Sequence, residues 1–537
     1  MTIKTSTAIF TTVILLVLSA VCYFAPRSYA QLPDKTVTPN SANVGINKSF
    51  AEQAGAGRGD VMTLASSMFI IKRDPFRAIR RGRQLFQRKF TRLQGLGPLS
   101  GDGTGNIETD LAIGAGLVDS CAGCHGRPRG AAGFGGDVVT RPDSRDAPHL
   151  FGLGLKEMLA DEITSDLRAI RHQAVDEALK STTNHTVTKS LTCKGINYGA
   201  ISATRRGTNV HVDTSAVTGV DHDLRVRPFF AHGGTISIRE FIVGAWNAEM
   251  GLQAVDTELA AAHSGATIMT PSGMVLDGAR DKIEAPPATS DSEDPDGDGV
   301  ANEIPTSIVD FMEFYLLNYF KPATYEQTRE VNAGREKFQE IGCAQCHIAD
   351  LQLNSDRRVA DLETVYDPVN GILNRLFATA SVLSTPQDDG SGFPALKRPS
   401  NQPFLVKNIF TDFKRHDLGP NFYERNYDGT LRREFLTTAL WGVGTSAPYG
   451  HDGRSLNLRE VILRHGGEAL RARESFAALS SGNQNKVLEF LRSLVIFPPD
   501  DTASNLDPGD PNAQFFPQFG HGSVKLTVLF NNPSEVE

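Results

Sequence analysis

The sequence predicts a mostly α-helical chain with two related halves and loop-rich insertions. Three observations lead to this prediction: the pattern Cys-x-x-Cys-His occurs twice, a Gly-x-x-x-Phe helix precedes each copy, and a capped helix follows each copy. With 537 residues, of which 40% are hydrophobic, the chain can bury more than one core. We therefore expect two related domains in tandem.

The first 30 residues have the features of a secretory signal peptide. Lys4 supplies a positive start, residues 8–22 are apolar, and Ser28 and Ala30 provide small side chains before the cleavage point. A retained membrane anchor is the alternative, but the apolar run is short for a bilayer span. We expect an exported, periplasmic protein without a stable membrane anchor.

The mature chain is predicted to be acidic. The formal charge of the full sequence is −8, and removing residues 1–30 removes Lys4 and Arg27 but no acidic residue, which gives −8 − 2 = −10. The phosphate backbone of nucleic acid repels a protein of this charge. We therefore expect no nucleic-acid partner.

The two pentapeptides have the attachment signature of c-type haem, in which two thiols add to the porphyrin vinyl groups and the histidine becomes an axial iron ligand. Zinc would need four protein ligands in one cluster, and a redox dithiol would not need the trailing histidine twice. We expect two covalently bound haem c groups, which agrees with export, and Cys193 as a buried, inert thiol. The predicted attachment residues are Cys121, Cys124 and His125, then Cys343, Cys346 and His347.

The segments around the two motifs have the order of a cytochrome c domain. Apolar spacing over residues 74–90 predicts a helix with Gly82 and Phe86, and Gly334 and Phe338 repeat this pattern before the second motif. After the first motif, the segment around Pro148 resembles one in which a proline carbonyl accepts a hydrogen bond from the proximal imidazole, which raises the basicity of that ligand.

The second capped helix is predicted to present a histidine. Asn457 and Glu460 have capping-box spacing, and His465 lies on the same face as the apolar residues at 458, 461 and 462. One interpretation is a hydrogen-bonded core histidine. The other is a second axial ligand for the His347 haem, which would make that centre low-spin, closed and suited to electron transfer.

The first capped helix differs at this point. Ser237 and Glu240 have the same capping spacing, but no histidine follows, and Glu249 falls about 20° from the apolar stripe that begins at Ile238. Glu249 could be a surface residue at a frayed helix end, and Met250 is a further candidate ligand. The functional interpretation is an open iron site with Glu249 as an acid–base group whose pKa burial raises. If the site is closed, His149 and His232 are candidate ligands opposite His125.

Together these stretches resemble the bacterial dihaem cytochrome c peroxidase superfamily, in particular its di-haem oxidoreductase (thiol oxidoreductase) branch. The stretches that carry the resemblance are residues 82–125, 145–161, 229–251, 334–347 and 435–467. In the family a ligand of the second haem lies 14 residues after the position of His451, which here is His465. Peroxidases usually have methionine there, so histidine implies a lower potential for this haem.

The resemblance also suggests catalytic residues. Asn247 to Gly251 is similar to the family pattern N-x-x-E-M-G, whose glutamate acts in peroxide O–O cleavage, and this implies that role for Glu249. Arg239 stands where peroxidases have a distal glutamine and is the second catalytic candidate. Phe230 is the nearest match for the family's tryptophan between the haems.

An acidic segment between the halves contains Asp294, Asp296 and Asp298, followed by Gly299, which is the alternating spacing of a calcium loop. The closing glutamate is missing, because Pro305 occupies the twelfth position, although Asn302 and Glu303 lie nearby. Calcium binding and a solvated acidic linker are the two interpretations.

The expected fold is therefore mostly α, with two cytochrome c-like haem domains. The predicted segments are a signal peptide (1–30), a flexible N-terminal segment (31–72), an N-terminal haem domain (73–260) with an insertion near 162–225, an acidic, proline-rich linker (261–310), a C-terminal haem domain (311–500) and a C-terminal extension (501–537).

The resemblance implies that hydrogen peroxide, or a related oxidant, is reduced at the His125 haem. The His347/His465 haem would relay electrons from an external donor such as a small cytochrome. Two alternatives remain: a non-catalytic electron-transfer cytochrome with both irons six-coordinate, and a haem oxygenase-type enzyme that uses dioxygen on an organic substrate.

Overall fold

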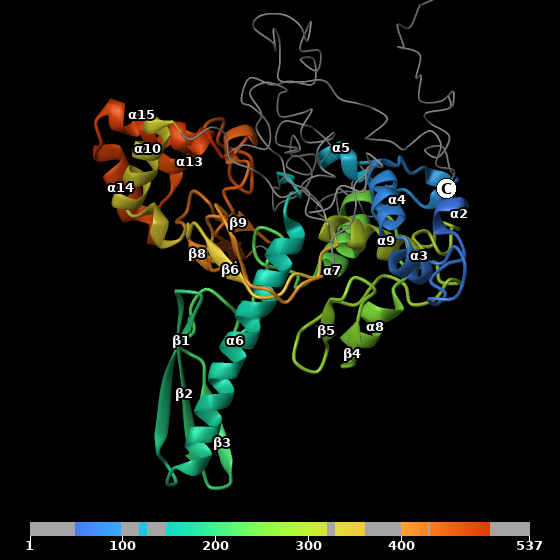
Figure 1. The fold of residues 1–537 in the computed structure, drawn as a ribbon, viewed down its shortest axis with the longest axis horizontal. Coiled ribbons are helices and arrows are strands. Elements are labelled where there is room, and N and C mark those ends of the chain that lie inside the picture. Colours follow the sequence, from blue (N-terminus) through green and yellow to red (C-terminus); the bar gives the residue numbers. More distant parts are fainter. Residues whose placement is uncertain are drawn as a thin grey trace, which may run out of the picture. The chain divides into compact units, whose positions relative to one another are not determined.

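The computed structural model describes residues 49–97, 118–125, 146–318, 328–359, 399–426 and 430–494. The predicted signal peptide and C-terminal extension lie outside these ranges. Helices predominate in the described part, as the sequence predicts, and small β-sheets accompany them (Figure 1). No helix in the described ranges combines the length and the hydrophobicity that a bilayer span requires.

The helices alternate with irregular segments along the whole described chain. The α-helices are α2 (Phe50–Ala54), α3 (Ser67–Arg73), α4 (Pro75–Gln87), α5 (Cys121–His125), α6 (Leu153–Lys180), α7 (Ile238–Ala245), α8 (Thr257–His263), α9 (Thr306–Leu317), α10 (Arg329–Glu340), α13 (Leu458–Arg464), α14 (Leu470–Ala478) and α15 (Ser481–Arg492). A π-helical turn, η2 (Trp246–Met250), continues α7. Short 3₁₀ turns are η1 (Arg92–Gln94), η3 (Cys343–Gln345), η4 (Val443–Thr445) and η5 (Gly467–Ala469).

The described strands form antiparallel sheets. The largest sheet has the order β1-β2-β3, with β1 (Thr186–Cys193), β2 (Ile196–Arg206) and β3 (Asn209–Asp213). The two-stranded sheets are β4 (Thr267–Met269) with β5 (Val275–Asp277), β6 (Leu351–Leu353) with β7 (Phe404–Val406), β8 (Arg415–Asp417) with β11 (Glu434–Leu436), and β9 (Glu424–Arg425) with β10 (Leu431–Arg432).

Two helix pairs explain why glycine is repeated before each Cys-x-x-Cys-His motif. Helix α4 packs on α9, and helix α10 packs on α15. A Cβ atom on Gly82 would overlap the carbonyl oxygen of Phe311, and one on Gly334 would overlap the carbonyl oxygen of Lys486. Glycine therefore permits the same close backbone approach in both halves of the chain.

The helix pairs also correct the predicted domain boundary at residue 311. Helix α9 begins at Thr306 and packs on α4, and its buried residues belong to the same apolar core as those of α4 and α7. The N-terminal helical unit therefore extends at least to the end of α9 at Leu317. The sequence pattern missed this because α9 is buried along nearly its whole length, so it has no amphipathic pattern, and it carries no motif.

Two segments predicted to be irregular are folded where the structure describes them. Part of the predicted flexible segment forms α2 and α3, because Ser66 caps α3 and Ile70 and Ile71 are buried. The predicted linker 261–310 also contributes to the N-terminal core, through Met274, Leu276 and other buried apolar residues. It is part of the N-terminal unit, and its acidic composition conceals that core.

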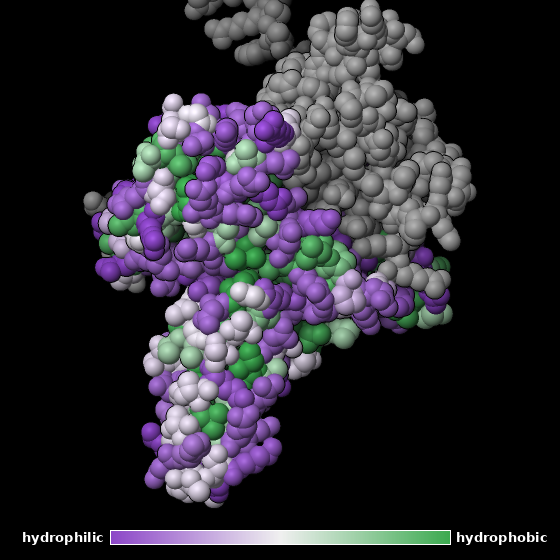
Figure 2. All heavy atoms as spheres, turned by 60° about the vertical axis from the view of Figure 1, so that its left-hand side comes forward, coloured by the Kyte–Doolittle hydropathy of each residue, from purple (hydrophilic) through white to green (hydrophobic). Residues whose placement is uncertain are grey.

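The predicted insertion near residues 162–225 is the C-terminal part of α6 together with the β1-β2-β3 sheet, which packs against it. Leu155, Leu159, Ile163 and Leu167 recur at intervals of four residues and are fully buried. Hydroxyl groups pair across the exposed face of β1 and β2, Thr186 with Thr204 and Thr188 with Ser202. The surface of the lower part of the molecule in Figure 2 mixes pale, purple and green. In the sequence of β1, the hydroxyl residues at 186, 188, 190 and 192 alternate with the apolar residues at 187, 191 and 193, and this period of two could have predicted the strand.

Candidate haem-binding site

Both Cys-x-x-Cys-His motifs line one cavity of about 1050 Å³. This volume is slightly above the roughly 300–1,000 Å³ usual for small-molecule sites. The cavity has contributions from both halves of the chain, because α5 and α7 line it together with α10, η3 and α13. It therefore has room for large planar groups.

The first motif forms helix α5, so its two thiols and its imidazole lie on a single helical turn. The Nδ1–H group of His125 donates a hydrogen bond to the carbonyl oxygen of Pro148 at 2.6 Å, the contact that the sequence predicts. The Phe86 ring packs 6.5 Å from the imidazole. Nε2 of His125 is therefore the ring nitrogen left for a metal ligand bond.

The second motif repeats this arrangement with a different acceptor. The Nδ1–H group of His347 donates to the carbonyl oxygen of Phe410 at 3.0 Å, and the Phe338 ring lies 6.0 Å from the imidazole. Phe410 has a left-handed backbone, with φ of 53°. Nothing in the sequence around Phe410 signals this role, because the acceptor is a backbone carbonyl.

His465 ends helix α13 and also lines the cavity, with Leu458, Val461 and Ile462 as predicted. Its Nδ1–H group donates to the carbonyl oxygen of Val461 at 2.6 Å. Thus His125, His347 and His465 each have Nδ1 fixed by a backbone carbonyl and Nε2 available. Such a hydrogen bond sets the tautomer and orientation of a histidine ligand.

Burial keeps these imidazoles neutral, which is the form that binds a metal. Desolvation lowers the pKa of His125 and of His347 to about 4 and also lowers the pKa of His465. Burial likewise raises the pKa of the Cys121 and Cys343 thiols to about 12. In this unmodified state the thiols are protonated.

The chemistry of the donor set fits haem c at both motifs. Paired thiols and an oriented imidazole face an apolar cavity, as covalent attachment and axial ligation require. Apolar lining residues include Phe86, Leu150, Leu153, Ile242, Met312, Leu316, Phe338, Ile341, Leu440, Val443, Leu458, Val461 and Ile462.

The capped helices α7 and α13 begin alike. The amide of Glu240 donates to the Ser237 hydroxyl, and that of Glu460 donates to the Asn457 side-chain carbonyl. In both copies the glutamate then accepts from the amide immediately before the cap residue, Ile236 or Leu456, instead of from the cap residue itself. The repeat predicted from sequence is therefore present in atomic detail.

The two helices differ at their ends. If Ile238 is aligned with Leu458, Ala245 takes the place of His465. Helix α13 ends there, whereas α7 continues as the π turn η2 to Gly251 and carries Glu249 into the cavity lining. The predicted position of Glu249 assumed α-helical geometry throughout. The wider π turn changes the angular positions of its residues, and such turns are frequent at functional sites.

The structure separates the two candidate ligands opposite His125. The Nε2–H group of His149 donates to the carbonyl oxygen of Trp441 at 2.5 Å, and its Nδ1 accepts from the amide of Phe151 at 3.3 Å. Both ring nitrogens are used, so His149 is not available as an iron ligand in this arrangement. His232 lines the cavity and stacks on Phe230 with ring centroids 6.0 Å apart.

Arg239 has a different position from the one expected of a catalytic residue. It is fully buried and is not among the residues that line the cavity. Its guanidinium pairs with four carboxylates instead. These are Asp256 at 2.7 Å, Glu313 at 2.8 Å, Asp310 at 2.9 Å and Glu258 at 3.3 Å. The catalytic assignment of Arg239 is corrected to a structural one.

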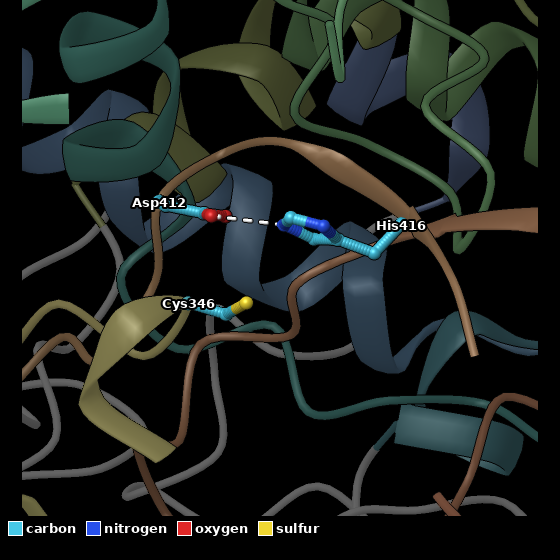
Figure 3. Close-up of side chains that lie close together, drawn as sticks. All are labelled: Cys346, Asp412 and His416. Carbon is cyan, nitrogen blue, oxygen red and sulfur yellow. Dashed lines mark hydrogen bonds and ion pairs between the residues drawn. The ribbon is translucent and has the colours of Figure 1, made fainter. Parts of the chain in front are cut away.

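Asp412 and His416 lie beside Cys346 of the second motif (Figure 3). His416 is held between Asp412, at 2.9 Å from Nε2, and Glu468, at 2.8 Å from Nδ1, and these partners raise its pKa to about 11 against the effect of burial. Cys346, Asp412 and His416 are close enough to hold a metal ion. Because Cys346 belongs to the attachment signature, we assign its sulfur to the haem.

Two cavity residues were missed from the sequence. Lys156 lies on α6, and burial lowers its pKa to about 8. Trp441 packs against Gly152, where a Cβ atom would overlap its indole ring, while its carbonyl accepts from His149. Trp441 thus joins the segment after the first motif to the C-terminal half. Neither residue has a sequence signal, because only tertiary contacts bring them to the cavity.

Cys193 lies apart from the cavity, in the core between α6 and the three-stranded sheet. Its side chain is buried, and its thiol donates to the Asp166 carboxylate at 3.0 Å. Burial and the neighbouring carboxylate raise its pKa to about 12. A thiol in this environment is a poor nucleophile.

The three aspartates of the predicted calcium loop are close together. Ligand atoms of Asp294, Asp296 and Asp298 lie within 4.8 Å of one another. The loop lies outside the cavity lining and is separate from the haem attachment residues.

Comparison with known proteins gives the class of this chain. The family described as "Di-haem oxidoreductase, putative peroxidase" matches residues 377–494, a stretch that contains His465 but neither Cys-x-x-Cys-His motif. This match to part of the C-terminal half supports haem cofactors and a redox role.

The other comparisons add less. A hydrazine synthase structure from Kuenenia stuttgartiensis shares 16% sequence identity, covering 35% of this chain and 55% of that chain, with a TM-score of 0.18. The chain thus spans about half the length of that protein, and a TM-score this low carries no argument about fold. No curated protein sequence matches the chain.

Proposed function

We propose that the protein is a periplasmic dihaem c-type oxidoreductase that reduces hydrogen peroxide, or a related oxidant, at the haem of the first motif. The haem of the second motif would relay electrons from an external donor, such as a small cytochrome. The chain would form two cytochrome c-like units, each built around one of the helix pairs α4/α9 and α10/α15.

The observation that supports this most strongly is the difference between α7 and α13. At the same point after the same cap, α13 presents His465, whereas α7 has Ala245 and then turns Glu249 into the cavity lining. A histidine favours a closed, six-coordinate iron, and an alanine leaves space. The pair therefore suggests one centre for electron transfer and one for an incoming oxidant.

The residues of this chain have separate tasks in the proposal. Cys121, Cys124, Cys343 and Cys346 would hold the haems, and the carbonyls of Pro148 and Phe410 orient the proximal imidazoles. Haem iron would supply the electron-transfer chemistry. The overall reaction takes two electrons and two protons to each hydrogen peroxide, breaks its O–O bond and releases two water molecules.

Glu249 is placed to handle a proton in this reaction. It lies in the cavity lining beside the buried residues Trp246 and Met250, and the reduction of peroxide requires a proton to move from one oxygen to the other. General acid–base groups contribute about 10²–10⁴-fold to rates. Arg239 has no part in this scheme, because its guanidinium is committed to the buried ion-pair network.

The test compares Glu249→Gln with a matched variant, Glu340→Gln, in the dihaem holoprotein. Glu340 lines the same cavity but is exposed and pairs with Lys337 at 2.5 Å. We expect Glu249→Gln to lower peroxide turnover about 10²–10⁴-fold and Glu340→Gln to leave it unchanged. Equal activity of the two variants would remove Glu249 from the mechanism.

Electron paramagnetic resonance tests the assignment of the two irons. We expect one low-spin centre that becomes high-spin in His465→Ala, and a second centre that binds cyanide in the oxidised or mixed-valence protein. If both centres are low-spin and closed to cyanide in every oxidation state, the protein is an electron-transfer cytochrome. His232, which lines the cavity, would then be the first ligand to examine.

A further inference from the structure

The acidic loop between β5 and α9 has a feature that its sequence pattern did not show. The amides of Gly297 and Gly299 donate to the Asp294 carboxylate at 2.9 and 3.0 Å, and the amide of Val300 donates to Asp298 at 2.7 Å. These hydrogen bonds fold the loop back on itself, so the three aspartates face a common point.

A fourth carboxylate, that of Glu303, is linked to this cluster through Gln253. Glu303 is only 2% exposed, and its Oε1 atom has no hydrogen-bond partner among the described residues. Its Oε2 atom accepts from the amide of Gln253 at 2.6 Å, while the side-chain amide of Gln253 donates to Asp296 at 3.4 Å. Gln253 therefore touches both acids and places Glu303 beside the aspartates.

The side-chain oxygen of Asn302 is also buried without a partner in the described part of the chain. Asn302 has a left-handed backbone, with φ of 53°, and this brings two consecutive side chains, those of Asn302 and Glu303, into the structure next to the loop. Unsatisfied buried oxygens cost about 1–3 kcal/mol each, more when charged. A bound ligand that interacts with these oxygens would remove this cost.

The charges around the loop favour a cation as this ligand. Within the described ranges, none of the four carboxylates forms an ion pair with a lysine or an arginine. Carboxylates gathered without a counter-charge attract a cation.

We infer that Asp294, Asp296, Asp298, Asn302 and Glu303 form a calcium site. Their five side-chain oxygens are the hard ligands that Ca²⁺ prefers, and the remaining positions of its six to eight would be filled by water or backbone carbonyls. In this proposal Glu303 takes the role of the closing glutamate, which the loop lacks at position 305. The left-handed backbone at Asn302 lies directly before it.

The site also reaches the π turn. Gln253, which contacts Glu303 and Asp296, donates to the side-chain carbonyl of Asn247 at 3.2 Å, two residues before Glu249. A bound ion would therefore fix the segment that follows η2. This consequence rests on the proposed function of Glu249, whereas the binding site itself does not.

Calorimetric titration of the chelator-treated holoprotein with CaCl₂ tests the site. We expect one Ca²⁺ per chain, with affinity lowered at least 100-fold in Glu303→Gln and in Asp296→Asn. Glu293→Gln is the matched control, because Glu293 is partly exposed in the same loop and accepts hydrogen bonds from Thr289 and Ser290 instead. The control should bind Ca²⁺ as the wild type does.

The outcomes are distinct. Absence of binding at millimolar Ca²⁺, or unchanged binding in both site variants, overturns the proposal, and binding of Mg²⁺ in preference to Ca²⁺ overturns the choice of ion. Terbium luminescence of the folded variants, measured beside their circular dichroism, separates lost binding from misfolding. Hydrogen exchange of residues 246–255 should slow when Ca²⁺ is added. If it slows but Glu249→Gln remains fully active, the site stands and the proposed function falls.

Discussion

The buried network around Arg239 gives a prediction that distinguishes a structural arginine from a catalytic one. We expect Arg239→Met to destabilise the protein strongly. The substitution removes a positive charge that pairs with Asp256, Asp310, Glu313 and Glu258, and the first three of these are at most 1% exposed. Breaking a buried ion pair from one side costs about 3–5 kcal/mol.

The structure places the expected loss near the lower end of this range. Arg58 also pairs with Asp310, at 3.2 Å, and with Glu258, so those two carboxylates keep a partner. Asp256 retains hydrogen bonds from the amides of Glu258 and Leu259. Among the described residues, Glu313 keeps the hydrogen bond from the Thr270 hydroxyl, at 2.6 Å. We therefore expect a loss of about 3 kcal/mol in the free energy of unfolding at pH 8.

The loss in unfolding free energy should depend on pH, and the direction of this dependence follows from the pKa values of the buried carboxylates. Burial already raises the pKa of Glu313 to about 7 with Arg239 present, and removing the guanidinium raises it further. The folded variant then binds a proton more tightly than the unfolded chain does. The stability of the variant should rise as the pH falls from 8 towards 5. The difference in the free energy of unfolding between the variant and the wild type should therefore become smaller.

Denaturant unfolding of the holoprotein at pH 8 and pH 5 measures this, with Arg280→Met as the control. Arg280 is exposed and pairs with Asp277 at 3.4 Å, so its loss should change stability by less than about 0.5 kcal/mol. A loss below about 1 kcal/mol for Arg239→Met would refute the buried-network argument. Full stability with abolished peroxide turnover would restore Arg239 as a catalytic residue.

Two further predictions concern the cores. Burial raises the pKa of Cys193 from 9.0 to about 12, so its thiolate fraction at pH 8 falls about 10³-fold. A thiol reagent should therefore modify one cysteine per chain only after the protein is unfolded. Rapid labelling of the native holoprotein would contradict this. Gly334→Ala should destabilise by about 1–3 kcal/mol because the new methyl group meets the Lys486 carbonyl, whereas Gly482→Ala in α15, which has open space, should stabilise by up to about 1 kcal/mol. Equal melting temperatures for the two variants would disprove the close helix crossing.

Local chemistry explains what could be predicted along the chain. Cys121 to His125 specifies its own chemistry, because two thiols and an imidazole at fixed spacing need no distant partner to be recognised. The caps at Ser237 and Asn457, the stop at Gly251 and the acidic loop are local in the same way. The contact between His125 and Pro148, which are 23 residues apart, was predicted instead from the resemblance of the segment around Pro148 to one in cytochrome c domains.

Tertiary contacts decide the rest, because burial and charge pairing depend on residues far apart in sequence. The resemblance suggested a catalytic role for Arg239, but its guanidinium forms ion pairs with Asp310 and Glu313 on α9. Glu303 became a candidate ligand only when the fold buried it without a partner. Helix spacing alone located His465 correctly, whereas the π turn at Glu249 depends on how the chain continues past Ala245. The sequence by itself determined which groups the protein can attach, and the packed structure decided which charged side chains remain available to act.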